Sequence, residues 1–172
     1  MTIFSATGHR PNKLYDAYPE RHGYDLLVSY AEYCLKLNNV LIMGTGMALG
    51  WDMAVAQACS NLRIPYVACI PFQGQECQWS KRSQEYYKFL VSLACQVVYV
   101  CDPGYAPWKM QRRNEYMVDN STKQLALWNG TSGGTGNCVK YAKSKKVKVV
   151  NCWDGYILGL RAMGIEFKGG RE

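Results

Sequence analysis

Short apolar runs alternate with segments of helical spacing along nearly the whole chain. The runs predict strands at 3–7, 40–43, 66–70, 96–101, 124–128 and 147–151, with helices between them at 24–37, 49–62, 79–94, 107–120 and 134–145. Such strict alternation predicts an α/β fold, a doubly wound and mainly parallel sheet with helices on both faces. The continuous apolar run 96–100 predicts a strand buried on both of its faces.

The length of 172 residues is that of one domain. We assign residues 1–153 to this domain and residues 154–172 to a C-terminal tail that is partly helical. The longest apolar runs fall far short of the roughly 20 residues that a membrane helix needs, so no membrane partner is expected. The chain opens on an expected strand and not on a basic secretory segment.

The eight cysteines include no Cys-x-x-Cys pair, and none lies beside a histidine at metal-ligand spacing. This argues against a zinc site, and we expect neither a metal nor a cofactor. Most of these thiols lie in apolar runs, which predicts reduced, buried cysteines and a cytoplasmic protein. Cys138, beside a glycine-rich loop, is the one whose reactivity merits a test, although burial is the expectation there as well.

The formal net charge is +7. A basic balance favours anionic partners such as nucleotides, nucleic acid or acidic surfaces, without choosing among them. Part of the excess is local, at lysines 140, 143, 145, 146 and 148, and we interpret that run as a solvated helix face and helix end.

In doubly wound sheets the ligand lies outside the carboxyl ends of the strands. The first strand-end loop, Thr7-Gly8-His9-Arg10-Pro11, combines a glycine with two side chains that suit anions. Arg10 offers a planar fork for phosphate or carboxylate, and His9 a hydrogen-bond donor or a proton-transfer group. A tight turn with a satisfied surface histidine is the alternative.

The second strand-end loop, residues 44–52, leads from a strand into a helix with small residues at every second position. Its backbone amides can meet an anion at the helix N-terminus, and Asp52 in the first turn can bind a ribose hydroxyl. The pattern is neither a Walker P-loop nor Gly-x-Gly-x-x-Gly. A plain glycine-rich cap, with Asp52 as a local acceptor, is the alternative.

The third loop, residues 129–137, carries the strongest signal, with hydroxyls and glycines that together form a nest of donors for phosphate. A flexible linker would not be expected between a buried strand and a helix. In the segment 108–117, Lys109, Arg112, Arg113 and Tyr116 share roughly one helical face. Arg112 or Arg113 can reach a ligand from this face, and Glu115 can hold that arginine in place. The alternative is a solvated amphipathic helix with no binding role.

Three aromatic residues, Trp79, Tyr105 and Trp108, are expected near the rim of this site. Each can stack a base, although core or rim packing explains each of them as well.

Several of these motifs resemble the SLOG superfamily of Rossmann-like nucleotide-binding domains. Residues 46–56 resemble the signature of the SMF/DNA-processing protein A group, with Thr45 in its serine position. Residues 132–136 resemble the glycine loop of the LONELY GUY (LOG) phosphoribohydrolases. Over residues 1–153 the chain looks most like the YpsA-like branch, including 7–11, 113–119 and 128–130.

The resemblance implies a nucleotide or nucleotide-derived ligand at the strand ends, and a homo-oligomer, without implying catalysis. Arg113 falls on the arginine position of LOG enzymes, but their catalytic glutamate position falls on Lys140. Ser132 and Asn137 replace the proline and the final threonine of their loop. A lysine does not stabilise an oxocarbenium-like centre as a carboxylate does, which argues against a LOG-type hydrolase.

We therefore expect a domain that binds or senses a nucleotide-like small molecule. The expected ligand-binding residues are Gly8, His9, Arg10, Thr45, Gly46, Gly50, Asp52, Arg113, Asn114, Ser132, Gly133, Gly134 and Thr135. One alternative is an enzyme that cleaves an N-glycosidic bond of a nucleotide, with Asp52, Glu76 or Glu115 as its carboxylate and Arg113 as a further candidate. Single-stranded DNA binding, suggested by the charge and the SMF likeness, ranks behind both.

Overall fold

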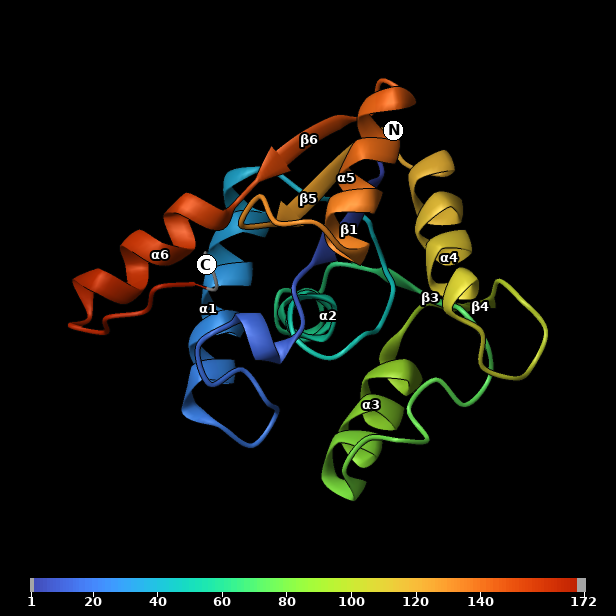
Figure 1. Ribbon diagram of the computed structural model, residues 1–172, viewed down its shortest axis with the longest axis horizontal. Helices are drawn as coiled ribbons and strands as arrows, with labels where there is room; N and C mark the ends of the chain where they lie inside the picture. The colour runs from blue at the N-terminus through green and yellow to red at the C-terminus, as the bar shows by residue number, and fades with distance from the viewer. Residues whose placement is uncertain (1, 170–172) are drawn as a thin grey trace.

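The computed structural model describes residues 2–169, which form a six-stranded parallel sheet of order β4-β3-β2-β1-β5-β6. The strands are β1 (Phe4–Gly8), β2 (Met43–Thr45), β3 (Tyr66–Ile70), β4 (Gln96–Tyr99), β5 (Lys123–Leu127) and β6 (Lys148–Asn151). The helices are α1 (His22–Leu37), α2 (Trp51–Asn61), α3 (Lys81–Leu93), α4 (Pro107–Asp119), α5 (Gly134–Ser144) and α6 (Trp153–Ala162), with a 3-10 turn η1 (Pro11–Lys13) after β1. The predicted doubly wound α/β fold is confirmed (Figure 1).

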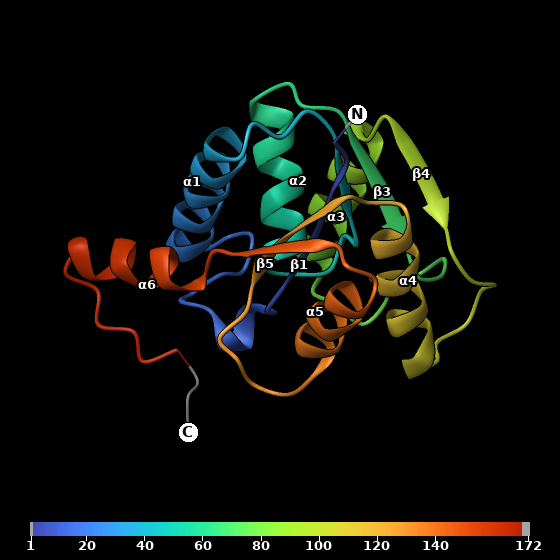
Figure 2. The ribbon, with the colours of Figure 1, turned by 90° about the horizontal axis from the view of Figure 1, so that it is seen from above.

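Helices cover both faces of the sheet. Figure 2 shows α1 and α2 on one side and α4 and α5 on the other, and each of these pairs is packed together. The main core lies under α1 and α2, where Trp51, Leu27 and Leu125 are fully buried. The alanine-rich α2 lets this helix approach β1 and β2 closely, since small side chains shorten the distance between helix and sheet.

Two predicted strands differ from the observed ones. The run 40–43 predicts a strand that in fact begins at Met43 and continues into Gly44 and Thr45, because Val40 instead closes the C-terminus of α1 by donating to the Leu35 carbonyl. The expectation that residues 96–100 are buried on both faces is wrong. β4 is an edge strand, and its Val97 and Tyr99 are 38% and 54% exposed.

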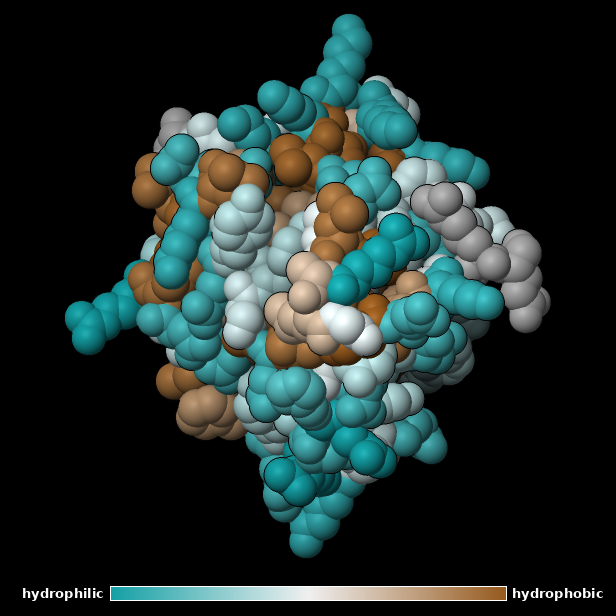
Figure 3. Space-filling model, turned by 90° about the vertical axis from the view of Figure 1, so that its left-hand side faces the viewer, coloured by the Kyte–Doolittle hydropathy of each residue, from teal (hydrophilic) through white to brown (hydrophobic). Residues whose placement is uncertain are grey.

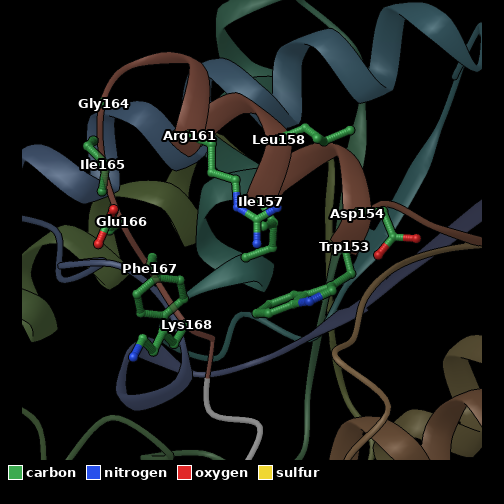
Figure 4. A pocket seen from close by; sticks show the side chains of 10 residues that line it. All are labelled: Trp153, Asp154, Ile157, Leu158, Arg161, Gly164, Ile165, Glu166, Phe167 and Lys168. Atoms are coloured by element: carbon green, nitrogen blue, oxygen red, sulfur yellow. The ribbon is translucent and has the colours of Figure 1, made fainter.

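The tail forms α6, which joins the main core through Trp153, Tyr156 and Leu160. Beyond α6 the chain returns toward β5, where the Asn129 side chain donates to the Gly169 carbonyl at 3.0 Å. A groove of about 730 Å³ separates α6 from this returning segment. Figure 4 shows Trp153, Ile157 and Arg161 projecting from α6 into the groove, with Phe167 on the opposite wall.

Hydrophobic and hydrophilic side chains mix on the face of the molecule that includes α6 (Figure 3). The large apolar side chains most exposed in this part of the chain are Leu158 on α6 and Met163 just after it. No helix within residues 2–169 is long and apolar enough to cross a membrane.

Candidate functional site at the carboxyl ends of β1 and β5

The strand order reverses between β1 and β5. From β1 the chain winds outward to β2, β3 and β4, and then crosses back to place β5 on the other side of β1. The two strands stay paired to their last residues, Gly8 and Leu127. The chain then leaves β1 toward α1 on one face of the sheet and leaves β5 toward α5 on the other (Figure 2). A ligand crevice is expected at such a switch point.

A pocket of about 210 Å³ opens at this point. Four parts of the chain contribute to it: the end of β1 with η1, the loop before α2, the middle of α4 and the start of α5. Its lining residues are Thr7, Gly8, His9, Arg10, Asn12, Lys13, Ala48, Asp52, Met110, Arg113, Asn114, Gly134 and Thr135.

Arg113 is the central cation of the pocket, and its side chain is only 4% exposed. Its Nη1 donates to the Gly46 carbonyl, and its Nε donates to Asn114 Oδ1 at 2.9 Å. A side chain at position 46 would overlap the guanidinium, so glycine is what permits this approach. These two bonds fix the orientation of the guanidinium and leave its remaining N–H groups for a guest.

Asp52 faces Arg113 from the first turn of α2. Its carboxylate accepts from the Ala48 backbone N–H at 3.4 Å, and its carbonyl accepts from the Thr45 hydroxyl at 2.8 Å. Burial raises the pKa of Asp52, and the nearby Arg113 guanidinium opposes that shift. The ion pairs within residues 2–169 do not include one between Asp52 and Arg113, but both side chains lie close to Gly46, and each charge favours the ionised form of the other.

His9 and Asn129 join the two strand-end loops. The Asn129 backbone N–H donates to His9 Nε2 at 3.0 Å, and Asn129 Oδ1 lies 2.7 Å from the same nitrogen. Burial lowers the pKa of His9, the side-chain hydrogen bond with Asn129 opposes this shift, and the charge on Lys13 adds a smaller lowering. Thr131 extends the network, since its hydroxyl donates to Asn129 Oδ1 at 2.6 Å and accepts from Lys13 Nζ at 2.9 Å. The network holds the start of the glycine-rich loop in place.

The N-terminus of α5 opens into the pocket without a side-chain cap. Gly133, at its N-cap position, has a φ of 137°, a conformation that glycine adopts readily. A Cβ atom added at Gly134 would meet nothing within 4 Å. The first-turn amides of an uncapped helix are suited to an anion.

The structure brings most of the predicted ligand-binding residues to this pocket, namely Gly8, His9, Arg10, Asp52, Arg113, Asn114, Gly134 and Thr135. Thr45, Gly46 and Gly50 lie behind the lining and position it. Gly50, with a φ of 93°, packs against the His9 carbonyl, to which the Trp51 N–H also donates. Ser132 and Gly133 are exposed in the loop just before α5.

Of the three carboxylates considered for catalysis, only one lies in the pocket. Asp52 lines the pocket, whereas Glu76 lies in the loop after β3, and Glu115 pairs with Arg112 at 3.5 Å. The helical face predicted for α4 also divides: Lys109 and Arg113 are buried, while Arg112 and Tyr116 are exposed.

Five lining residues were not among the expected ligand-binding residues: Thr7, Asn12, Lys13, Ala48 and Met110. Thr7 and Ala48 nevertheless belong to the two strand-end loops that were expected to form the site. Lys13 and Asn12 follow Arg10 within one turn, and Met110 precedes Arg113 by one turn of α4. That spacing could have indicated them, but their direction depends on η1 and on how α4 packs.

All eight cysteines are free thiols, and five of them, including Cys138, are buried. Burial raises the pKa of Cys138, which fits the expectation of an unreactive thiol. Across residues 2–169, no three His, Cys, Asp or Glu side chains gather as a metal site would require.

The YpsA family model, described as the YspA SLOG family, matches residues 25–153. The chain belongs to the YpsA SLOG family. A related sequence is the SPbeta prophage-derived protein YoqJ of Bacillus subtilis, 33% identical over 135 residues that cover 69% of this chain and 79% of YoqJ.

Solved structures of two DNA-processing proteins share the fold of this YpsA-family chain. DNA processing protein A (DprA) of Streptococcus pneumoniae superposes with a TM-score of 0.62 at 16% identity, over 98% of this chain and 59% of DprA. The chain therefore spans less than two thirds of that protein. DNA processing protein A of Helicobacter pylori, solved to study its single-stranded DNA binding mode, gives a TM-score of 0.60 at 12% identity, over 95% of this chain and 73% of the other.

Proposed function

We propose that the chain binds a nucleotide or nucleotide-derived small molecule in the pocket between β1 and β5. The observation that carries this proposal is the charge of the lining. Arg113, Arg10 and Lys13 contribute three cations against the single carboxylate of Asp52, and the uncapped N-terminus of α5 adds a positive dipole end. Such a lining favours a phosphorylated guest.

The pocket volume limits what enters it. At about 210 Å³ it is smaller than the roughly 300 Å³ at which sites for drug-sized ligands begin. A phosphorylated pentose is the proposed occupant, with its phosphate toward α5 and Arg113 and its hydroxyls toward Asp52. The base would then lie outside this pocket.

A nucleotide hydrolase is the second candidate, and Asp52 is the observation that favours it. It is the one predicted carboxylate that lines the pocket, opposite the arginine that matches the LOG position. Release of free base from nucleoside monophosphates would support hydrolysis, whereas saturable binding without release supports the binding function. Binding of single-stranded DNA, as named for the H. pylori neighbour, would instead show affinity that falls steeply with salt.

Mass spectrometry of small molecules that remain bound through purification tests the proposal. Gly134→Asp places a carboxylate in open space at the helix N-terminus, where it suits the helix dipole but repels an anion. We expect the wild-type protein to retain a phosphorylated molecule and Gly134→Asp to lose it while remaining folded.

Gly159→Asp on α6 is the matched control, because a Cβ there also meets nothing within 4 Å and the site lies elsewhere. It should retain the molecule. Equal retention by Gly134→Asp and wild type would contradict the proposed site.

A further inference from the structure

A second cavity, of about 500 Å³, lies at the carboxyl end of β4. It borders the loop that runs from β4 into α4, whose path Figure 1 shows. Its lining residues are Gln73, Tyr99, Val100, Cys101, Asp102, Pro103, Trp108 and Arg112. It shares no lining residue with the pocket between β1 and β5, which we call the proposed phosphate pocket. Trp108 and Arg112 are one turn apart on one stripe of α4, while Met110, Arg113 and Asn114 face the first pocket from another.

The wall of this cavity is held firmly. Lys109, 8% exposed, donates from Nζ to the carbonyls of Asp102, Pro103 and Gly104 at 2.8, 3.2 and 2.7 Å. The strand side is fixed as well, since Val100 and Cys101 donate their backbone N–H groups to the Ile70 and Pro71 carbonyls. The loop therefore forms a preorganised wall, although it lies at the edge of the molecule.

Two aromatic side chains of this cavity are exposed to solvent: Tyr99 by 54% and Trp108 by 61%. Both rings line the cavity, whose volume of about 500 Å³ gives room for a planar guest. The Lys109 ammonium lies 5.7 Å from the centre of the Trp108 ring and orients the indole from one side. Exposed aromatic rings at the wall of a cavity suit a planar guest.

The polar groups around these rings point to a heterocycle and not to a hydrocarbon or an anion. Gln73 offers a donor and an acceptor, Asp102 an acceptor and Arg112 a donor. The Arg112 charge is paired with Glu115 at 3.5 Å, and Asp102 brings a negative charge, so the cavity lacks the cationic excess of the proposed phosphate pocket. A neutral ring that carries both donors and acceptors matches this environment.

We infer that the cavity at the end of β4 is a second binding site, which holds the nucleobase of a nucleoside, a nucleotide or a single strand by stacking it against Tyr99 and Trp108. The class of ligand rests on the proposed function, but the geometry of the site does not. The shared chemistry is the base itself, whether it comes from a free nucleotide or from an oligonucleotide.

Titration calorimetry with adenosine and cytidine, which carry no phosphate, tests this inference. We expect saturable binding that Trp108→Ala weakens by about tenfold or more, the range measured for loss of base stacking. Because Trp108 is largely exposed, this variant should fold normally. Trp108→Phe should retain binding but lose the quenching of tryptophan fluorescence, which identifies Trp108 as the ring that the base contacts.

Tyr116→Ala is the matched control, an exposed aromatic on the same helix that does not line this cavity, and it should bind as the wild type does. Absence of nucleoside binding to the wild type, or equal affinities for Trp108→Ala and wild type, would overturn the inference. Ribose 5-phosphate, which has no base, should neither compete with adenosine nor respond to Trp108→Ala. Failure of ribose 5-phosphate to bind at all would count against the first pocket alone.

A single-stranded oligonucleotide of about four nucleotides separates the two sources of the base. Binding that is tighter than that of the nucleoside and sensitive to Trp108→Ala would assign the site to a strand. Equal affinity for both would assign it to a free nucleoside or nucleotide. Either result supports base stacking, whereas oligonucleotide binding that is unaffected by Trp108→Ala would contradict it.

Discussion

Single residues set the electrostatics of the pocket between β1 and β5. Arg113 is held by a backbone carbonyl and an amide oxygen, and Asp52 is the nearby carboxylate that partly compensates its charge. This leaves a buried cation that is oriented before any ligand arrives. Preorganised charge of this kind costs little reorganisation on binding.

Gly46→Ala tests whether the approach of Arg113 depends on the missing side chain. The added methyl would overlap the guanidinium and lie 2.7 Å from Asp52 Oδ2, so Arg113 must move. We expect a loss of about 1–3 kcal/mol of stability, measured by urea unfolding, and weaker binding of ribose 5-phosphate.

Gly44→Ala is the control, since its new methyl would meet only the Phe4 carbonyl at 3.8 Å and Cys69 Sγ at 3.9 Å, which are ordinary contacts. Gly44→Ala should therefore cost less stability than Gly46→Ala. Similar losses in the two variants would show that Arg113 is not sensitive to this position.

We expect the stability of the protein to depend on pH, because His9 is buried. Burial lowers its pKa in the folded protein below the ordinary value of 6.5, so the unfolded chain binds a proton at higher pH than the folded one does. This contribution to stability is complete above about pH 6.5 and is lost as the pH falls from there through the folded-state pKa. The free energy of unfolding, measured in urea between about pH 7 and pH 5, should decrease.

His9→Gln should flatten that decrease, because the titrating ring is gone. His22→Gln serves as its control, since His22 is exposed at the first position of α1 and its replacement should leave the slope unchanged. A slope in His9→Gln equal to that of the wild type would refute the assignment to His9.

At the scale of elements, the alternation of apolar runs with segments of helical spacing was sufficient to predict the order of strands and helices from residue 3 to residue 151.

The edge position of β4 was not predictable, because the order of strands in the sheet is set by the crossover connections and not by the local sequence pattern. The start of β2 was missed since Val40 and Leu41 are apolar, although Val40 packs at the end of α1 and Leu41 is 64% exposed. Many residues that line the pocket between β1 and β5 were predicted, because their loops follow strands. Lys13 and Met110 were not, because the direction of their side chains depends on how η1 and α4 pack.

The packing of α6 against α1 depends on Gly155. A Cβ there would overlap the Tyr30 hydroxyl, which donates to the Cys152 carbonyl at 2.7 Å. We expect Gly155→Val to destabilise the protein by about 1–3 kcal/mol, as overpacking does. Thermal unfolding followed by circular dichroism would measure this loss.

Gly159→Ala, in the same helix, meets no atom within 4 Å and should be neutral or stabilising by up to about 1 kcal/mol. If Gly155→Val were as stable as Gly159→Ala, α6 would not be docked on α1 as described.

At the scale of the whole molecule, the sheet presents two chemically different sites along one carboxyl edge. The site between β1 and β5 is cationic and small, and the site at the end of β4 is aromatic and close to charge balance. We propose that the first takes the phosphate of a nucleotide and the second takes a base. The central claim is the first of them, a phosphorylated sugar held by Arg113 and α5.

Titration calorimetry with ribose 5-phosphate at low salt tests that claim most directly, because this probe lacks the base that the second site would recognise. The account predicts one saturable site in the wild type and in Gly159→Asp, with binding lost in the folded Gly134→Asp. No binding to the wild type, or equal binding to Gly134→Asp, would contradict it.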